Sequence, residues 1–248
     1  MCIRDSIKVH YKSIDKTGNQ ETTKTATIKI DKTPPTGTII INGGDAYTIS
    51  TSVTLTLTST DDASGVREVR FSNDGVWDDE PWEVPAATKD WALLSGDGIK
   101  TVYVQYVDNA GLVSQSYSAT ITLDTTSPAI IITSPSPGYE IKSSTITVTW
   151  AGSDGTSSVS HYEIKLDDYS WINVGINTTY TFTGLGDGTH TLEIKATDNA
   201  GLTKEDSLDF VVNTSPLLGP GYVEEVAIAA TTIIAAIGVP LYFKIRKH

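Results

Sequence analysis

The sequence is poor in the residues on which thiol, metal and acid–base chemistry depend. It has one cysteine, Cys2, and four histidines among 248 residues. A single cysteine cannot form an intramolecular disulfide or a thiolate cluster. His10, His161 and His190 lie far apart in the strand pattern, with no glutamate at metalloenzyme spacing. We therefore expect each of these histidines to be an exposed strand residue.

Motifs for nucleophilic catalysis and phosphate binding are also missing. No serine lies in a nucleophile elbow, and no glycine loop opens a helix that could bind phosphate. We expect a chain that is not an enzyme, with no catalytic residues and no organic cofactor.

Positive charge is scarce. Lysine and arginine total 18 against 30 aspartate and glutamate residues, which gives a formal net charge of −12. An acidic surface repels nucleic acid and anionic lipid headgroups, so we expect no nucleic-acid partner.

What the chain does have is a long internal repeat. Three similar phrases lie about ninety residues apart, and a second landmark follows each of them. The phrases are Asp15-Lys16-Thr17-Gly18-Asn19, Asp108-Asn109-Ala110-Gly111-Leu112 and Asp198-Asn199-Ala200-Gly201-Leu202; the landmarks are Asp31-Lys32-Thr33-Pro34-Pro35, Asp124-Thr125-Thr126-Ser127-Pro128 and Asn213-Thr214-Ser215-Pro216. A period of this length indicates one small domain per repeat.

Alternating apolar and polar residues precede each phrase. Val102, Val104 and Tyr106 alternate with more polar neighbours, as the equivalent residues of the next repeat do, and Val9 and Tyr11 have the same register in the first, truncated copy. Such a pattern predicts strands with one buried face. Each complete repeat has about seven such runs and none with a helical period, which predicts a β-sandwich.

These patterns divide the chain into the following parts. Residues 7–32 are the last two strands of a truncated repeat, residues 33–126 and 127–214 are complete sandwiches, and residues 215–222 are a linker. A two-stranded ribbon is marginally stable alone, so residues 7–30 are expected to be poorly ordered or to pair with a sheet edge of the next repeat.

The first six residues do not align with the repeat. Met1-Cys2-Ile3-Arg4-Asp5-Ser6 resembles the translation of a transposon-end adapter used in sequencing libraries. We interpret residues 1–6 as foreign to the protein and exclude them from fold reasoning; the alternative is a natural start. On this interpretation the native protein has no cysteine.

The carboxyl-terminal part has the pattern of a membrane anchor. We expect residues 223–243 to form one transmembrane helix, because the stretch from Val226 to Phe243 has no charge and is about 27 Å long as an α-helix. Residues 244–248 are basic, and positive charge remains on the cytoplasmic side, so the repeats are expected outside the cell. The alternative is a buried helix of a globular domain.

The segment before this span, Gly219-Pro220-Gly221-Tyr222, resembles archaeal sorting signals of the Pro-Gly-Phe type. In that family the tail is removed and exchanged for a lipid anchor. Tyr222 stands where that family has phenylalanine, so a retained transmembrane anchor is preferred to cleavage.

The repeats resemble the bacterial and archaeal immunoglobulin-like repeats of large surface proteins. The resemblance is carried by the linkers, the Arg70-Phe71-Ser72-Asn73-Asp74-Gly75 turn, Ser95-Gly96-Asp97-Gly98 and Val107-Asp108-Asn109-Ala110-Gly111. It implies an all-β fold of tandem immunoglobulin-like sandwiches in an adhesion, surface-layer or stalk protein, and it implies no catalytic residues. The alternative is the stalk of a surface protease or glycosidase whose catalytic head lies upstream.

Aspartates concentrate in the turns. Flexible loops rich in carboxylates can bind calcium, whereas aspartate before asparagine or glycine is also ordinary turn chemistry. Both interpretations remain open for Asp61, Asp62, Asp97, Asp108, Asp154, Asp187 and Asp198.

Two further groups of residues are candidates for contact with partners. Trp77 and Trp82 are the best pair for a platform that stacks on surface glycans, although Trp77 recurs as Trp171, which favours packing. Asn177 and Asn213 lie in glycosylation sequons. We expect a cell-surface, single-pass membrane protein whose partners are the membrane and surface glycans or other surface proteins.

Overall fold

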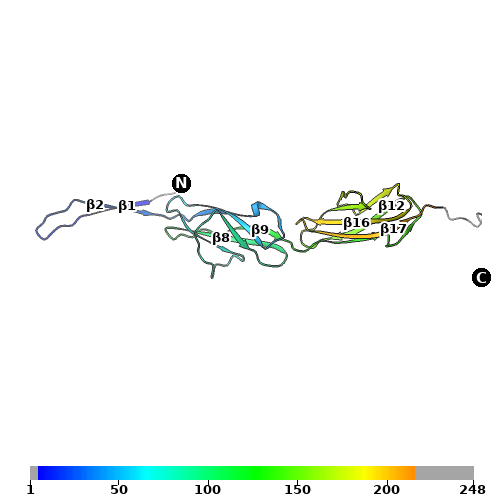
Figure 1. Ribbon diagram of the computed structural model, residues 1–248. Coiled ribbons are helices and arrows are strands. Elements are labelled where there is room, and N and C mark those ends of the chain that lie inside the picture. The colour runs from blue at the N-terminus through cyan, green and yellow to red at the C-terminus, as the bar shows by residue number, and fades with distance from the viewer. Residues whose placement is uncertain (1–4, 216–248) are drawn as a thin grey trace, which may run out of the picture.

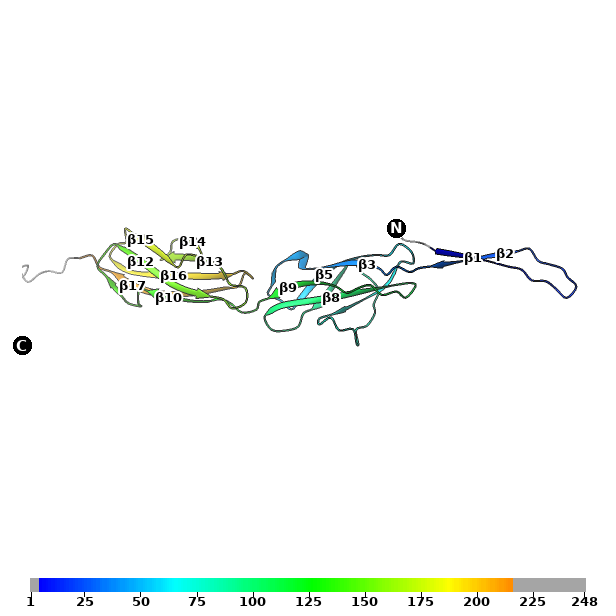
Figure 2. The same ribbon diagram turned by 180° about the vertical axis from the view of Figure 1, so that it is seen from behind.

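The computed structural model describes residues 5–215, and this part of the chain is all-β apart from one short 3-10 helix. It divides into a two-stranded ribbon, a first module and a second module, which lie in line in both views (Figures 1 and 2). Residues 5–215 contain no helix that is long and apolar enough to span a membrane. The expected transmembrane helix at 223–243 lies outside the described residues.

The first module is a sandwich of a three-stranded and a four-stranded sheet. The strand orders are β3-β5-β7 and β4-β9-β8-β6, and the short β4 runs parallel to β9 whereas the other pairs are antiparallel. Its elements are β3 (Thr36–Ile41), the 3-10 helix η1 (Asn42–Gly44), β4 (Tyr47–Thr48), β5 (Ser52–Thr60), β6 (Val66–Ser72), β7 (Thr88–Ala92), β8 (Gly98–Asp108) and β9 (Tyr117–Leu123).

The second module repeats this plan with one additional strand. Its sheets have the orders β10-β12-β15 and β11-β17-β16-β13-β14, so the count is eight strands and not the seven that the sequence suggests. The strands are β10 (Ala129–Ser134), β11 (Glu140–Ile141), β12 (Thr145–Ser153), β13 (Val159–Leu166), β14 (Ile172–Gly175), β15 (Thr179–Thr183), β16 (Gly188–Asp198) and β17 (Thr203–Val212).

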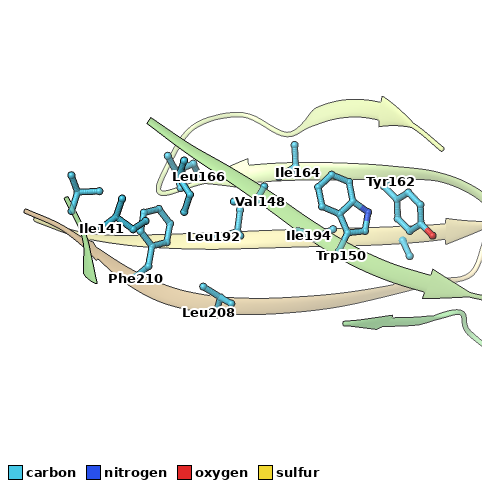
Figure 3. Packing of buried hydrophobic residues seen from close by; sticks show 13 residues of the cluster. Ile141, Val148, Trp150, Tyr162, Ile164, Leu166, Leu192, Ile194, Leu208 and Phe210 are labelled. Atoms are coloured by element: carbon cyan, nitrogen blue, oxygen red, sulfur yellow. The ribbon is translucent and has the colours of Figure 1, made fainter. Parts of the chain in front are cut away.

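Each module has its own hydrophobic core, formed by the alternating residues that the sequence places on one face. Val102, Val104 and Tyr106 of β8 are buried, and so are Leu192 and Ile194 of β16. Figure 3 shows the second core, with Trp150 and Tyr162 at one end and Ile141 and Phe210 at the other. The two cores share no residue, which indicates that each module folds around its own interior.

The ribbon consists of β1 (Asp5–Tyr11) and β2 (Lys24–Ile30), paired antiparallel from Asp5↔Ile30 to Tyr11↔Lys24. These strands pair with each other and with no sheet edge of the first module. Val9 and Tyr11 are 41% and 52% exposed, although their alternation matches a buried register. The reason is that the ribbon has no opposing sheet to cover this face.

Candidate cation sites at the module junctions

Six aspartates come together as two groups of three, one group at each junction between parts. Within each group, one carboxylate oxygen from each residue lies within 4.8 Å of the others. We call these groups junction site 1 (Asp31, Asp61 and Asp108) and junction site 2 (Asp124, Asp154 and Asp198).

Both sites are assembled in the same way from one linker residue and two loops of the module that follows. In junction site 2, Asp124 directly follows β9 of the first module, Asp154 follows β12, and Asp198 ends β16. In junction site 1, Asp31 follows β2, and the other two aspartates come from the loop after β5 and from the end of β8. Each site therefore joins two parts of the chain.

The aspartate after β5 or β12 is held by the backbone of its own loop. Asp154 Oδ1 accepts hydrogen bonds from the amides of Thr156, Ser157 and Ser158 at 3.0, 2.7 and 2.9 Å. Asp61 Oδ1 accepts from three equivalent amides, at distances between 2.7 and 3.2 Å. The loop thereby fixes the direction of the second carboxylate oxygen.

The aspartate that ends β8 or β16 also accepts a hydrogen bond through Oδ1 within its own turn. Asp108 Oδ1 accepts from the Leu112 amide at 2.8 Å, and Asp198 Oδ1 accepts from the Leu202 amide at 2.9 Å. The asparagine that follows each of them ties the two loops together, since Asn199 Nδ2 donates to the Ser157 carbonyl at 2.7 Å and Asn109 makes the same type of contact.

The linker aspartates follow the same rule. Asp31 Oδ1 accepts from the Thr33 amide at 3.0 Å, and Asp124 Oδ1 accepts from the Thr126 amide at 3.1 Å. In all six residues, then, Oδ1 is occupied by the residue's own turn.

Four of the remaining oxygens are buried without any hydrogen-bond partner. These are Oδ2 of Asp31, Asp108, Asp124 and Asp198, and the last three residues are 0%, 0% and 2% exposed. Buried polar atoms are nearly always paired, and a buried carboxylate oxygen without a partner is costly. Within residues 5–215 no ion pair reaches any of the six aspartates.

Local hydrogen bonds also favour ionised carboxylates at these sites. The Ser64 hydroxyl and the Thr33 amide lower the pKa of Asp31. Burial raises the pKa of Asp154, but the amides of Ser157, Thr156 and Ser158 outweigh this and leave it below its usual value.

Asp15 shows what the same phrase does outside a junction. In the exposed ribbon its carboxylate accepts hydrogen bonds from the side chains of Thr17 and Asn19 and from both amides, which lowers its pKa to about 2. Among the described residues Asp15 belongs to no group of three carboxylates. The phrase by itself therefore forms a self-contained turn.

Of the seven aspartates singled out from the sequence, four belong to the junction sites and three do not. Asp62 is exposed and lies outside both groups. Asp97 accepts hydrogen bonds from Thr125 and from Thr126 Oγ1, and Asp187 accepts from Thr214. Asp97 and Asp187 thus hold the segment that leaves each module, and the Thr126 and Thr125 hydroxyls lower the pKa of Asp97.

Sequence reasoning missed the two linker aspartates of the junction sites, Asp31 and Asp124. The available signal was their recurrence as the first residue of the landmark that follows each phrase. The third landmark has Asn213 in this place, and its Nδ2 donates to Glu140 Oε1 at 2.7 Å. An amide at that position replaces the carboxylate that the other two landmarks supply.

The tryptophan pair is organised around an arginine. The guanidinium carbon of Arg70 lies 4.7 Å from the ring centroid of Trp77 and 4.6 Å from that of Trp82, within cation–π range. Arg70 also donates to Gln105 Oε1. In the second module Trp171 contacts the ammonium groups of Lys165 and Lys195 in the same way. The two tryptophans are brought together, and their role as a glycan platform stays a prediction.

The expectation of an exposed strand residue is met by His10 but is wrong for His161, which is partly buried, and for His190. His190 is half-buried, stacks on Phe210, and places Nδ1 2.8 Å from Asp167 Oδ2 and Nε2 2.9 Å from the Gly186 carbonyl. Burial lowers the pKa of His190, but the Gly186 carbonyl and the Asp167 carboxylate outweigh it and raise the pKa above its usual value. The alternating pattern could not show this, because Asp167 directly follows β13 whereas His190 lies in β16, and only the fold brings them together.

The two sequon asparagines differ in exposure. Asn177 is exposed in the turn between β14 and β15, whereas Asn213 is half-buried and bonded to Glu140. Glycosylation stays a prediction for both, with Asn177 the more accessible acceptor.

Part of the second module matches a known sequence family. Residues 128–194 match the family described as Bacterial Ig domain. This agrees with the sandwich topology, and both modules are immunoglobulin-like β-sandwiches in tandem. No curated protein matches the chain.

Solved structures with tandem β-modules are similar at low identity. The fibronectin(III)-like modules of Clostridium thermocellum CbhA align at 16% identity with a TM-score of 0.43, covering 71% of this chain and 94% of that one. The FN1-FN3 domains of chicken CNTN1 align at 12% identity with a TM-score of 0.37, covering 83% and 75%. A tetra-tandem repeat from the extending region of a large adhesion protein gives 19% identity and 0.31, covering 86% and 57%. These TM-scores are too low to transfer any property to this chain.

Proposed function

We propose that this chain is a non-catalytic spacer of an extracellular surface protein of the adhesion or surface-layer type, anchored in the membrane through its carboxyl-terminal segment. The observation that carries the proposal is the arrangement of the modules in line, with the ribbon at one end and the end of β17 at the other (Figures 1 and 2). Modules that follow one another end to end add length, at about 3.3 Å for each strand residue.

The short connection between the modules supports an extended arrangement. Thr125 and Thr126 of the linker are bonded back to Asp97 of the first module, and Pro128 at the start of the second module is buried. Proline also restricts the backbone at this point. The linker is therefore held at both ends and leaves little freedom for the modules to fold back.

The site chemistry within residues 5–215 supports a role other than catalysis. His190 is next to a carboxylate, but its Nε2 faces the Gly186 carbonyl and its ring is covered by Phe210. A general base must reach a proton on its substrate, and here both ring nitrogens already have partners.

Length is the direct test of the spacer. Because each module has its own core, a fragment of residues 31–215 should fold as a monomeric, all-β protein, and small-angle scattering should give a maximum dimension of roughly 60 Å or more. A fragment of residues 127–215 is the matched single-module control and should be about half as long. A two-module particle no longer than the single module would contradict the proposal, as would substantial helix in its circular dichroism.

Anchoring requires a separate test on the tail. When the full chain is expressed in a bacterium, it should sediment with membranes and resist an alkaline carbonate wash. A chain ending at Ser215 should appear in the soluble fraction. Soluble full-length protein would contradict the anchor without affecting the spacer.

Adhesion to glycans is a second candidate role, favoured by the position of Trp77 and Trp82 around Arg70. Glycan-array binding by residues 31–215 should then be lost in Trp77→Ala and Trp82→Ala and retained in Trp171→Ala. An inert wild-type fragment would remove this candidate and leave display of another domain as the role of the modules.

A further inference from the structure

We propose that junction site 1 and junction site 2 each bind one Ca²⁺ ion, and that the ion fixes the linker to the module that follows it. Each site offers one carboxylate from the linker and two from the module, with the contributing oxygens within 4.8 Å of one another. This spacing allows three oxygens to surround one ion.

The unpartnered oxygens point to a ligand more directly than the acidic composition does. Asp108, Asp124 and Asp198 are almost fully buried, and their Oδ2 atoms have no hydrogen-bond partner. A buried carboxylate needs a counter-charge or a proton, and three carboxylates in contact repel one another. A divalent cation between them satisfies the free oxygens and cancels the repulsion.

The donor set selects a hard cation. All three side chains of each site are carboxylates, with no cysteine or histidine in either group. Calcium takes six to eight oxygen ligands in flexible geometry, whereas magnesium demands a near-ideal octahedron and keeps several waters. Side chains held by three separate segments suit the less demanding ion, and carbonyls or waters can complete its shell.

The location of the sites gives binding a mechanical consequence. Asp124 belongs to the segment that Thr125 and Thr126 tie to the first module through Asp97, while Asp154 and Asp198 belong to the second module. An ion shared by these three residues would couple the linker directly to the second module, in addition to the hydrogen bonds to Asp97 and the buried Pro128. This consequence, unlike binding itself, rests on the proposed spacer role.

Calorimetric titration of the full chain with CaCl₂, in mild detergent, tests the binding. We expect two sites in the wild type and one in either Asp31→Asn or Asp124→Asn. The matched control is Asp97→Asn, which converts a carboxylate that contacts the linker into an amide but leaves all six site carboxylates, and it should retain two sites. The proposal is overturned if the wild type binds no calcium up to about 5 mM, above the usual range for extracellular modules, or if Asp124→Asn retains two sites.

Thermal unfolding separates loss of an ion from damage to the fold. Calcium should raise the unfolding temperature of the wild type, because an ion that binds only the native state stabilises it. In EDTA, Asp124→Asn should be at least as stable as the wild type, since one repelling charge is gone, but its second module should no longer respond to calcium. A variant equally destabilised with and without calcium would show a purely structural aspartate and refute the site.

Failure of the spacer role can be told apart from failure of the sites. A chain that binds two calcium ions but is compact in scattering would retain the sites and refute the spacer. A chain that is extended in EDTA and binds no calcium would retain the spacer and refute the sites. Magnesium chloride at the same concentrations is the control for ion type, and an equal response to both ions would overturn the assignment to calcium.

Discussion

The two modules have the same sandwich, but they fill the space between their sheets differently. In the first module Tyr106 of β8 lies against Gly37 of β3, and its hydroxyl donates to the Thr38 carbonyl at 3.1 Å. The equivalent residue in the second module is the small Ala196, and the ring comes instead from Tyr162 of β13, which lies against Gly152 of β12.

In each module a buried tyrosine ring is paired with a glycine, but the pair occupies different strands in the two modules. A tyrosine ring needs a neighbour without a Cβ, and the two modules meet this need from different strands. In the second module Trp150 packs against this tyrosine, with its ring edge-on to Tyr162 at a centroid distance of 5.9 Å (Figure 3). In the first module burial raises the pKa of Tyr106 to about 12, so its hydroxyl remains a donor throughout the physiological range.

The largest expected effect tests whether the two cores are independent. Leu55 and Leu192 are both 0% exposed, one in each core. Leu55→Ala should destabilise the first module by about 2–5 kcal/mol, because it leaves a cavity, and should leave the second module unchanged. Leu192→Ala should do the reverse. Calorimetric scans of residues 31–215 that show both transitions moving together would refute independent folding.

The glycine–tyrosine pairs are expected to differ in their tolerance of a methyl group. A Cβ at Gly37 would lie 2.3 Å from the Tyr106 ring and 2.6 Å from the Thr58 carbonyl oxygen, whereas the three atoms nearest to a Cβ at Gly152 all belong to the Tyr162 side chain, the first at 2.6 Å. Gly37→Ala should therefore cost about 1–3 kcal/mol and Gly152→Ala less, because a side chain moves more easily than backbone.

The matched control for this pair is Gly186→Ala, since a Cβ at Gly186 would meet nothing within 4 Å. Chemical denaturation of the three variants measures the difference. Equal losses for Gly37→Ala and Gly152→Ala would show that the carbonyl of Thr58 is not the deciding obstacle.

The smallest expected effect is a pH dependence confined to the second module. The raised pKa of His190 means that its charged form is stabilised by folding, so the contribution is complete below the unfolded pKa of about 6.5 and is lost as pH rises through the folded pKa. The first module has Lys100 in the equivalent place and no histidine.

Thermal scans between about pH 5.5 and 8.5 should show the second transition falling relative to the first as pH rises through the neutral range. His190→Gln should remove this relative change. A persistent change in that variant would assign the titration to another group.

The sequence by itself determined the repeat, the all-β class and the buried face of each long strand. Val53, Leu55 and Leu57 alternate with threonines and are buried. The sequence alone predicts which face of the strand is apolar, because the period of two in a strand is a local property that no tertiary contact is needed to define. The same pattern misplaced Val9 and Tyr11, because burial also requires an opposing sheet, and the ribbon has none.

Only the tertiary structure decided which aspartates meet. Asp124, Asp154 and Asp198 come from a linker and two loops; the sequence singled out Asp154 and Asp198 as turn or calcium residues and did not single out Asp124. Their convergence depends on the loop after β12 lying beside the end of β16, where Asn199 is bonded to Ser157, and on the path of the linker into the second module. Likewise, Asp97 and Asp187 lie in turn sequences like those of the site residues, but they are at the opposite end of the module and bind the segment that leaves it. Side-chain type and turn propensity are local, whereas a group of ligands is a meeting of distant segments, and folding alone brings those together.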